Sequence, residues 1–416
     1  MQHVLVDVLH VLLAAAISIP TLMREGEVPG LSMVVIHRGR VVSHENYGVA
    51  DDTIFEAASL GKPVFAYAVM KLVEAGKLSL DVPLDHYLPS GVDDERAKLI
   101  TARMVLSHTT GFQNEVMPGE KLAIHFTPGS QFSYSGAGFL YLQRVVEHIT
   151  GKPLASLMQE LVFTPLGMRD SGYVWIPAYE TRKAFGHRPS GCVAERRKPS
   201  VATVATLHTT TSDYERFVIA MMREPRGMLA KQVELNESLA WGLGIALEKT
   251  PRGTAFWHHG ENNAEFHTFV MAYPDGDGVV IFTNSGNGFS IIPDIISAVL
   301  GGPHPAFAWM GYEHYDAPAK LVLRDIRARG FEAASSALDA LSEREINRIG
   351  YILLDVDRVS DAMRIFEHNA ARFPNSANVH DSLGEAYAAA ALASYTRSLE
   401  LDPKNENARQ WIAKLR

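Results

Sequence analysis

Two chemically active side chains lie three residues apart in the segment Glu56-Ala57-Ala58-Ser59-Leu60-Gly61-Lys62. Apolar residues recur on one helical face between residues 59 and 74, so Ser59 and Lys62 share a face at the start of a predicted helix. In a partly dehydrated site, a lysine amine can take the proton of a neighbouring serine hydroxyl and so activate it as a nucleophile. The backbone N–H groups at such a helix start can also stabilise a developing oxyanion.

A second segment, Phe132-Ser133-Tyr134-Ser135-Gly136, carries a phenol that suits the same chemistry. Beside a lysine, the hydroxyl of Tyr134 can shuttle a proton. Taken alone, however, Tyr134 is more typical of a core aromatic residue with a satisfied hydroxyl.

A third segment, Trp257-His258-His259-Gly260-Glu261, falls on a predicted strand. Because Gly260 has no side chain, an acyl group can approach this strand closely, and one backbone N–H can complete an oxyanion hole. The histidine pair also permits metal binding. No further ligand pattern such as His-Glu-x-x-His accompanies it, so a metal site is the weaker alternative.

Strand patterns occur at both ends of the first 300 residues, with helical patterns between them. The predicted strands are a hairpin at 31–49 and strands at 241–248, 256–259, 266–273 and 279–284, and the predicted helices are 59–74, 140–150 and 213–223, the last capped by Thr211 or Ser212. This order predicts an α/β fold of the α+β type, in which an antiparallel sheet is built from both ends of the domain and flanked by helices.

The composition is typical of a globular protein. The 416 residues are 47% hydrophobic with a formal net charge of −8, which argues against disorder of the whole chain and against nucleic acid or an anionic membrane as the main partner. Cys192 is the only cysteine, so no internal disulfide forms and cysteine usage does not report the compartment.

The N-terminal residues 1–20 are apolar but lack the basic region of an export signal. His3, Asp7 and His10 fall on one helical stripe, which favours an amphipathic helix packed on the domain over a retained signal. The compartment (periplasmic, secreted or cytoplasmic) stays open, and no membrane span is expected.

A repeat follows residue 310. Gly350 and Gly384 are 34 residues apart, which is the period of tetratricopeptide repeats. Two later pairs are only 29 residues apart, Phe366 with Tyr395 and Pro374 with Pro403. The second repeat is therefore degenerate or lacks its turn. We predict a hydrolase domain over residues 1–310 and a small all-α, tetratricopeptide-like domain over 311–416, through which the chain docks on a protein partner or self-associates.

Several segments, in order, resemble the serine β-lactamase or penicillin-recognising superfamily, in particular its class C-like branch, which includes family VIII carboxylesterases. Besides the three segments above, the matching ones are Leu106-Ser107-His108-Thr109-Thr110-Gly111, Phe126-Thr127-Pro128-Gly129, Phe163-Thr164-Pro165-Leu166-Gly167-Met168 and Trp241-Gly242-Leu243-Gly244. The resemblance covers roughly residues 17–300. No Gly-x-Ser-x-Gly occurs, which excludes an α/β-hydrolase nucleophile elbow. The resemblance implies that Ser59 is the acylated nucleophile, that Lys62 is its base or proton relay, and that Tyr134 is the second base and leaving-group acid.

The resemblance also implies roles for residues of the strand segment, and two positions, His258 and Gly136, depart from the family pattern. His258 and Gly260 occupy the first and third positions of the family's Lys-Thr-Gly motif, and the backbone N–H groups of Ser59 and Glu261 would form the oxyanion hole. His258 replaces a lysine that pairs with a substrate carboxylate, and histidine is only partly charged near pH 7. Gly136 stands where many relatives have an asparagine that helps to hold the lysine and the substrate. These departures favour esters or other neutral acyl substrates over penicillins.

The sequence therefore predicts a serine hydrolase that needs neither metal nor cofactor, most simply a carboxylesterase acting on small-molecule acyl substrates. β-Lactamase-like, D,D-peptidase and D-aminopeptidase activities stay open as alternatives. A binding module in which the helical tail does the main work is the non-enzyme alternative, but the presence of both Ser59 and Lys62 argues against it.

Overall fold

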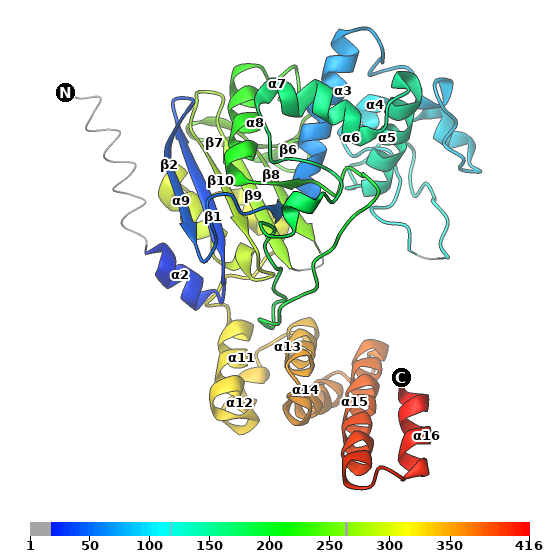
Figure 1. Cartoon of the computed structure of the whole chain (residues 1–416), viewed down its shortest axis with the longest axis vertical. Coiled ribbons are helices and arrows are strands. Elements are labelled where there is room, and N and C mark those ends of the chain that lie inside the picture. Colours follow the sequence, from blue (N-terminus) through cyan, green and yellow to red (C-terminus); the bar gives the residue numbers. More distant parts are fainter. Residues whose placement is uncertain (1–17, 118, 263–264) are drawn as a thin grey trace, which may run out of the picture. The chain divides into compact units, whose positions relative to one another are not determined.

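The computed structural model describes residues 18–117, 119–262 and 265–416, and they form two compact units (Figure 1). The first unit ends at Glu313. It omits the short segment Pro189–Cys192, which belongs to the second unit together with His314–Arg416. The predicted N-terminal amphipathic helix lies almost entirely outside the described residues. Where the description begins, Ser18 caps helix α2 (Ile19–Glu25) by accepting a hydrogen bond from the backbone N–H of Thr21.

The first unit is built on an eight-stranded sheet in which every neighbouring pair is antiparallel. The strand order is β2-β1-β10-β9-β8-β7-β6-β5. The strands are β1 (Leu31–His37), β2 (Arg40–Tyr47), β5 (Val233–Glu234), β6 (Leu239–Trp241), β7 (Ala246–Thr250), β8 (Gly253–Asn262), β9 (Phe266–Ala272) and β10 (Gly278–Thr283). Because β1 pairs with β10, the N-terminal hairpin and the late strands share one sheet, as the sequence predicts.

Helices cover this sheet and form the part of the unit that carries the nucleophile. They are α3 (Gly61–Glu74), α4 (Ala102–Leu106), α5 (Gly136–Thr150), α6 (Leu154–Met158), α7 (Thr164–Leu166), α8 (Thr211–Arg223), α9 (Ile292–Leu300) and α10 (Pro305–Met310). Strands β1, β9 and β10 are buried along their whole length. Helix α8 packs on β1 and β10 and α9 packs on β10 (Figure 1), whereas β9 is covered by the 3₁₀ turns at Ala58–Leu60 and Gly288–Ser290. The predicted α+β class, with an antiparallel sheet flanked by helices, is confirmed.

Two local predictions were wrong. Residues 241–248 form the end of β6 and the start of β7 rather than one strand, because Gly244 has a φ of +80° and the chain reverses there. A side chain at Gly242 would also meet the carbonyl oxygen of Met228. Helix α8 is capped by Thr210, one residue before the predicted cap, and the Thr210 side chain accepts a hydrogen bond from the Asp213 N–H.

The second unit is all-α. Its helices are α11 (Pro318–Arg329), α12 (Ser335–Leu338), α13 (Glu343–Asp355), α14 (Val359–Arg372), α15 (Ala377–Leu401) and α16 (Glu406–Leu415). Helices α13 and α14 pack as a pair, with the Phe366 ring against Gly350. The expected inter-helix turn of the second repeat is absent from the described unit, because 25 residues continue as the single helix α15. Alanine has the highest helix propensity, so the segment Ala388-Ala389-Ala390-Ala391 allows the helix to continue without a break.

Candidate functional site

The candidate nucleophile stands on a tight turn before α3. Ser59 lies in the 3₁₀ turn Ala58–Leu60, and Lys62 occupies the first turn of α3. The amine Nζ of Lys62 donates a hydrogen bond to the Ser59 Oγ at 3.0 Å. Lys62 is only 3% exposed. Ala58 has a φ of +47°, a left-handed conformation that non-glycine residues rarely adopt. Strain of this kind is typical of functional sites, and here it lies directly before Ser59.

Tyr134 lies beside the amine of Lys62. The distance from the Lys62 Nζ to the centroid of the Tyr134 ring is 5.1 Å. The Tyr134 hydroxyl is buried and has no hydrogen-bond partner among the described residues. The arrangement thus brings a hydroxyl, an amine and a phenol together, and the phenol is free to bond a substrate atom or a water molecule.

His108, a residue with no predicted catalytic role, packs against the Tyr134 ring. The two rings stack with centroids 4.1 Å apart and an interplanar angle of 26°. The His108 Nδ1 accepts a hydrogen bond from the Ser135 N–H at 3.0 Å, which ties the ring to the start of α5. Burial, with the nearby Lys62 and His258, holds the pKa of His108 well below its usual value, so the ring is neutral. The indication in the sequence that His108 belongs to the site was its position in the segment 106–111, which resembles the family.

Strand β8 runs against the nucleophile turn. A Cβ at Gly260 would lie under 3.0 Å from the carbonyl oxygen of Ala57, so only glycine permits this approach. Side chains alternate along the strand, and His259 and Glu261 therefore face the cleft. Glu261 lines the same cavity as Ser59.

His258 points the other way, into the core. It is 1% exposed, and its ring lies 6.2 Å from that of Tyr134 and 5.6 Å from that of Trp241. Its Nδ1 is 2.7 Å from the carbonyl oxygen of His259, so this nitrogen carries the proton. Burial, followed by the effects of His259 and Lys62, lowers the pKa of His258 well below its usual value. The position where relatives carry lysine is therefore neutral here and lies outside the cleft lining.

The cleft has two lobes that meet at Ser59. The first lobe, about 540 Å³, is lined by Ser59, Asn114, Glu115, Tyr134, His259, Glu261, Trp309, Met310 and Tyr312. The second lobe, about 420 Å³, shares Ser59, Asn114, Glu115 and Glu261 with the first and adds Ala58, Lys62, Val116, Gly136, Ala137, Leu140, Thr203, Val204, Ala205 and Asn262. Sequence reasoning missed the walls contributed by residues 114–116, 203–205 and 309–312, because contacts between distant segments leave no local pattern.

Gly136 lines the second lobe as part of the start of α5. Its N–H donates a hydrogen bond to the Asn114 Oδ1 at 2.9 Å, and a Cβ at position 136 would lie 2.8 Å from the Asn114 carbonyl oxygen. The glycine that departs from the family's asparagine is thus explained by packing, because the backbone of Asn114 occupies the space that a side chain would need. Asn114 itself supplies an amide side chain to the same wall.

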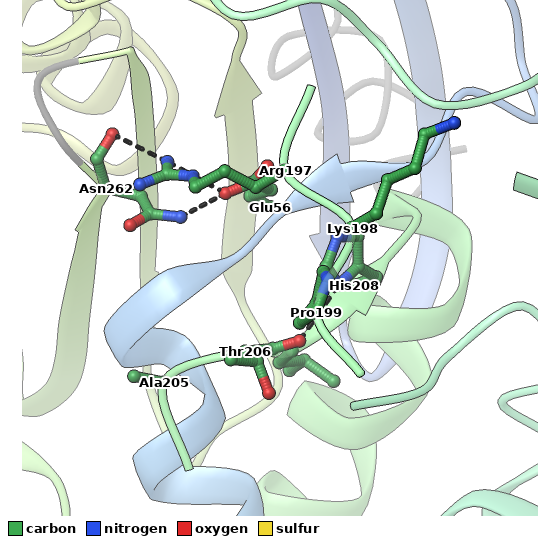
Figure 2. Close-up of a pocket in the computed structure, with 9 residues that line it drawn as sticks. Glu56, Arg197, Lys198, Pro199, Ala205, Thr206, His208 and Asn262 are labelled. Carbon is green, nitrogen blue, oxygen red and sulfur yellow. Dashed lines mark hydrogen bonds and ion pairs between the residues drawn. The ribbon is translucent and has the colours of Figure 1, made fainter. Parts of the chain in front are cut away.

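A buried ion network beside the nucleophile lines a separate pocket of about 390 Å³ (Figure 2). Glu56 is paired with the buried Lys183 and with Arg197, the latter at 2.9 Å. The side-chain amide of Asn262 donates a hydrogen bond to the same carboxylate. Figure 2 shows Arg197 and Asn262 converging on Glu56. Since Glu56 precedes the nucleophile turn and Asn262 ends β8, this network connects the two elements that form the site.

Comparison with known proteins identifies the family. The Beta-lactamase family model matches residues 18–294, and the chain belongs to this family. Over 192 residues the chain is 33% identical to the esterase EstB of Burkholderia gladioli. The matched region covers 36% of this chain and 49%, about half, of EstB. It is 27% identical over 322 residues to penicillin-binding protein 4 of Amycolatopsis lactamdurans, covering 67% of this chain and 83% of that protein.

Two solved structures share the fold. The D-alanine carboxypeptidase AmpC of Burkholderia cenocepacia has a TM-score of 0.58 and 20% identity, covering 68% of this chain and 96% of that one. The octameric penicillin-binding protein homologue of Pyrococcus abyssi has a TM-score of 0.57 and 19% identity, covering 75% and 80%. The protein accordingly has the β-lactamase fold, which is that of a serine hydrolase family. In the part of the chain that the structure describes, no helix has the length and apolar character needed to span a membrane.

Proposed function

We propose that this protein is a carboxylesterase that hydrolyses small-molecule esters through an acyl-enzyme at Ser59. The observation that carries the proposal is the 3.0 Å hydrogen bond from the Lys62 amine to the Ser59 hydroxyl, with the unpartnered phenol of Tyr134 beside the same amine. This geometry supports activation of a serine without a metal or a cofactor.

In the first half-reaction, the Lys62 amine takes the Ser59 proton while the Ser59 Oγ attacks the ester carbonyl carbon. The carbonyl oxygen becomes an oxyanion that accepts hydrogen bonds from the backbone N–H groups of Ser59 and Glu261. As the tetrahedral intermediate collapses, Tyr134 gives its proton to the departing alkoxide, and the Lys62 ammonium returns a proton to Tyr134. The alcohol leaves and an acyl-Ser59 ester stays.

In the second half-reaction, a water molecule gives a proton to the Tyr134–Lys62 pair and attacks the acyl carbon. The same two N–H groups stabilise the second oxyanion. Collapse of this intermediate breaks the bond to the Ser59 Oγ, which regains its proton, and the carboxylic acid is released. Atoms and charges balance over the cycle, since one ester and one water give one alcohol and one acid.

The charge of the cleft supports an ester rather than an anionic lactam or peptide. His258 is neutral and buried where a cation would pair with a substrate carboxylate. Among the described residues that line the two lobes, Lys62 is the only Lys or Arg, and it is engaged with Ser59. The similarity to the esterase EstB adds support from the family.

The test compares hydrolysis of p-nitrophenyl butyrate by the wild type and by Ser59→Ala. We expect the variant to lose about 10³-fold or more in kcat, since the covalent route is removed. Ser130→Ala, an exposed serine away from the lobes, is the matched control. Intact-protein mass after exposure to a fluorophosphonate should show one adduct in the wild type and none in Ser59→Ala.

A cephalosporin and a D-alanyl-D-alanine peptide are the competing substrates. Faster turnover of either than of the ester would contradict the carboxylesterase proposal in favour of a lactamase or peptidase. Equal, negligible turnover of all three substrates by wild type and Ser59→Ala would contradict hydrolysis at this site altogether.

A further inference from the structure

The two lobes of the cleft differ in character. Aromatic side chains line the first lobe and not the second, with Tyr134, Trp309 and Tyr312 on its walls. Small and aliphatic side chains contribute much of the second, among them Val116, Ala137, Leu140 and Val204. Since both lobes open onto Ser59, the two halves of an ester would meet different surroundings.

Tyr134 shows which half enters which lobe. It lines the first lobe and not the second. Under the proposed mechanism its hydroxyl gives the proton to the departing oxygen, so the alcohol portion of the ester occupies the lobe that Tyr134 lines. The acyl chain then extends into the aliphatic second lobe.

Two carboxylates, those of Glu261 and Glu115, line the first lobe, and both also line the second. Hydrogen bonding from His267 and then from the Tyr312 hydroxyl lowers the pKa of Glu261 to about 2, so its carboxylate is ionised at neutral pH. Burial lowers the pKa of His259 to about 4, so this neighbour adds no positive charge at neutral pH.

We propose, resting on the carboxylesterase function above, that the enzyme prefers esters whose alcohol portion carries a positively charged ammonium group, and that Glu261 selects it. The ammonium would lie near the Glu261 carboxylate in the lobe that Trp309 and Tyr312 also line, and these aromatic side chains can add cation–π attraction. An anionic alcohol portion is repelled by the same carboxylates. The backbone N–H of Glu261 serves the oxyanion and its side chain sets the charge preference, so one residue contributes to both rate and specificity.

The test uses a pair of esters that have the same shape and differ in charge. Butyrylcholine carries a quaternary ammonium, and 3,3-dimethylbutyl butyrate has carbon in place of the nitrogen. We expect kcat/KM for butyrylcholine to exceed that of its carbon isostere about tenfold, the size of one partly desolvated ion pair together with a cation–π contact. The ratio should shrink in 1 M salt because screening weakens the charge contribution.

Glu261→Gln keeps the size and the backbone N–H and removes the charge. We expect the ratio of the two kcat/KM values to fall toward one in this variant and to stay at the wild-type value in Glu95→Gln, whose carboxylate is exposed and distant from the lobes. A wild-type ratio of one or less, or a ratio that neither Glu261→Gln nor salt changes, would overturn the proposal. The neutral ester, with Ser59→Ala, separately reports the proposed function, so the two failures are distinguishable.

Discussion

Gly260 in the first unit and Gly384 in the second unit have different structural roles. In the first unit, Gly260 lets β8 approach the carbonyl oxygen of Ala57, and any side chain there would collide with backbone. In the second unit, Gly384 lies within α15, where an added Cβ would meet nothing within 4 Å. The first glycine is required by close packing around the nucleophile, whereas the second only weakens a helix.

The difference extends to the surroundings of each glycine. Strand β9, the neighbour of β8, is buried at all seven positions, whereas α15 buries only Val379, Ser382 and Ala386 of its 25 residues. A tightly packed interior leaves its atoms little room to move. The first unit can therefore hold the atoms of the candidate site in fixed positions. Helix pairs in the second unit depend mainly on contacts with their neighbours along the chain.

The largest effect is expected from Gly260→Ala. The new Cβ would push β8 away from Ala57, and with it the Glu261 N–H that the mechanism uses. We expect kcat/KM on p-nitrophenyl butyrate to fall about 100-fold, as a displacement of about 1 Å at a reacting centre typically causes. Circular dichroism should show a folded protein. Unchanged kinetics would show that β8 does not need this close approach.

The next largest effect is expected in the pH dependence of stability, which tests whether burial in the first unit keeps a histidine uncharged. Burial lowers the pKa of His208 to about 4 from an ordinary 6.5, and its Nδ1 bonds the Thr206 carbonyl oxygen in the neutral form. Between these pH values the unfolded chain binds the proton and the folded chain does not. The free energy of unfolding therefore falls as the pH drops from 6.5 to 4, by about 2 kcal/mol from this residue.

The measurement is urea unfolding at pH 7 and pH 4.5, followed by tryptophan fluorescence, for the wild type and His208→Gln. The variant, which cannot gain the proton, should lose less stability over this interval. Four of the five tryptophans report on the first unit: Trp175, Trp241, Trp257 and Trp309. Parallel pH curves for the two proteins would contradict the assignment to His208.

Gly350→Ala should have a somewhat smaller effect, confined to the second unit. The Cβ would meet the ring of Phe366, which is fully buried and has no free space to move into. Overpacking of this kind costs about 1–3 kcal/mol. Amide hydrogen exchange should show faster opening of α13 and α14 with unchanged esterase kinetics. Unchanged protection in both helices would mean that this pair packs less tightly than described.

The smallest effect, with the opposite sign, is expected from Gly384→Ala, the position one repeat further on. Alanine favours helix over glycine by about 0.5–1 kcal/mol, and here the added methyl group is unhindered. Hydrogen exchange within α15 should slow by a few-fold. A loss of protection would show that this face of α15 is covered, and the contrast between Gly350 and Gly384 would disappear.

Much of the fold could be predicted because its signals are local. The hairpin of β1 and β2 follows from two strand-like runs on either side of Arg38-Gly39, whose φ values of +52° and +70° suit a tight two-residue turn. Helix α5 ends at Gly151 in the left-handed conformation, as the glycine predicted. The division of residues 241–248 was missed although it lies at a local signal, because the chain reverses at Gly244, where φ is +80°.

The candidate site also has features that the sequence predicts and features that it does not. The spacing of Ser59 and Lys62 alone predicted a shared helical face, and the two side chains are hydrogen bonded. The stacking of His108 on Tyr134 could not be predicted, because 26 residues separate two rings that only the folded chain brings together. The roles proposed for Tyr134, His258, Gly260, Glu261 and Gly136 stay predictions.

By itself, the sequence determined most of the elements, the family and the shared face of Ser59 and Lys62, because helix periodicity and motif spacing act over a few residues. Only the tertiary structure decided the charge and shape of the cleft. His258 is neutral because the fold buries it, and Glu261 is ionised because Tyr312 and His267 come from elsewhere in the chain to meet it. Burial and charge pairing are properties of the assembled core, and no short segment contains them.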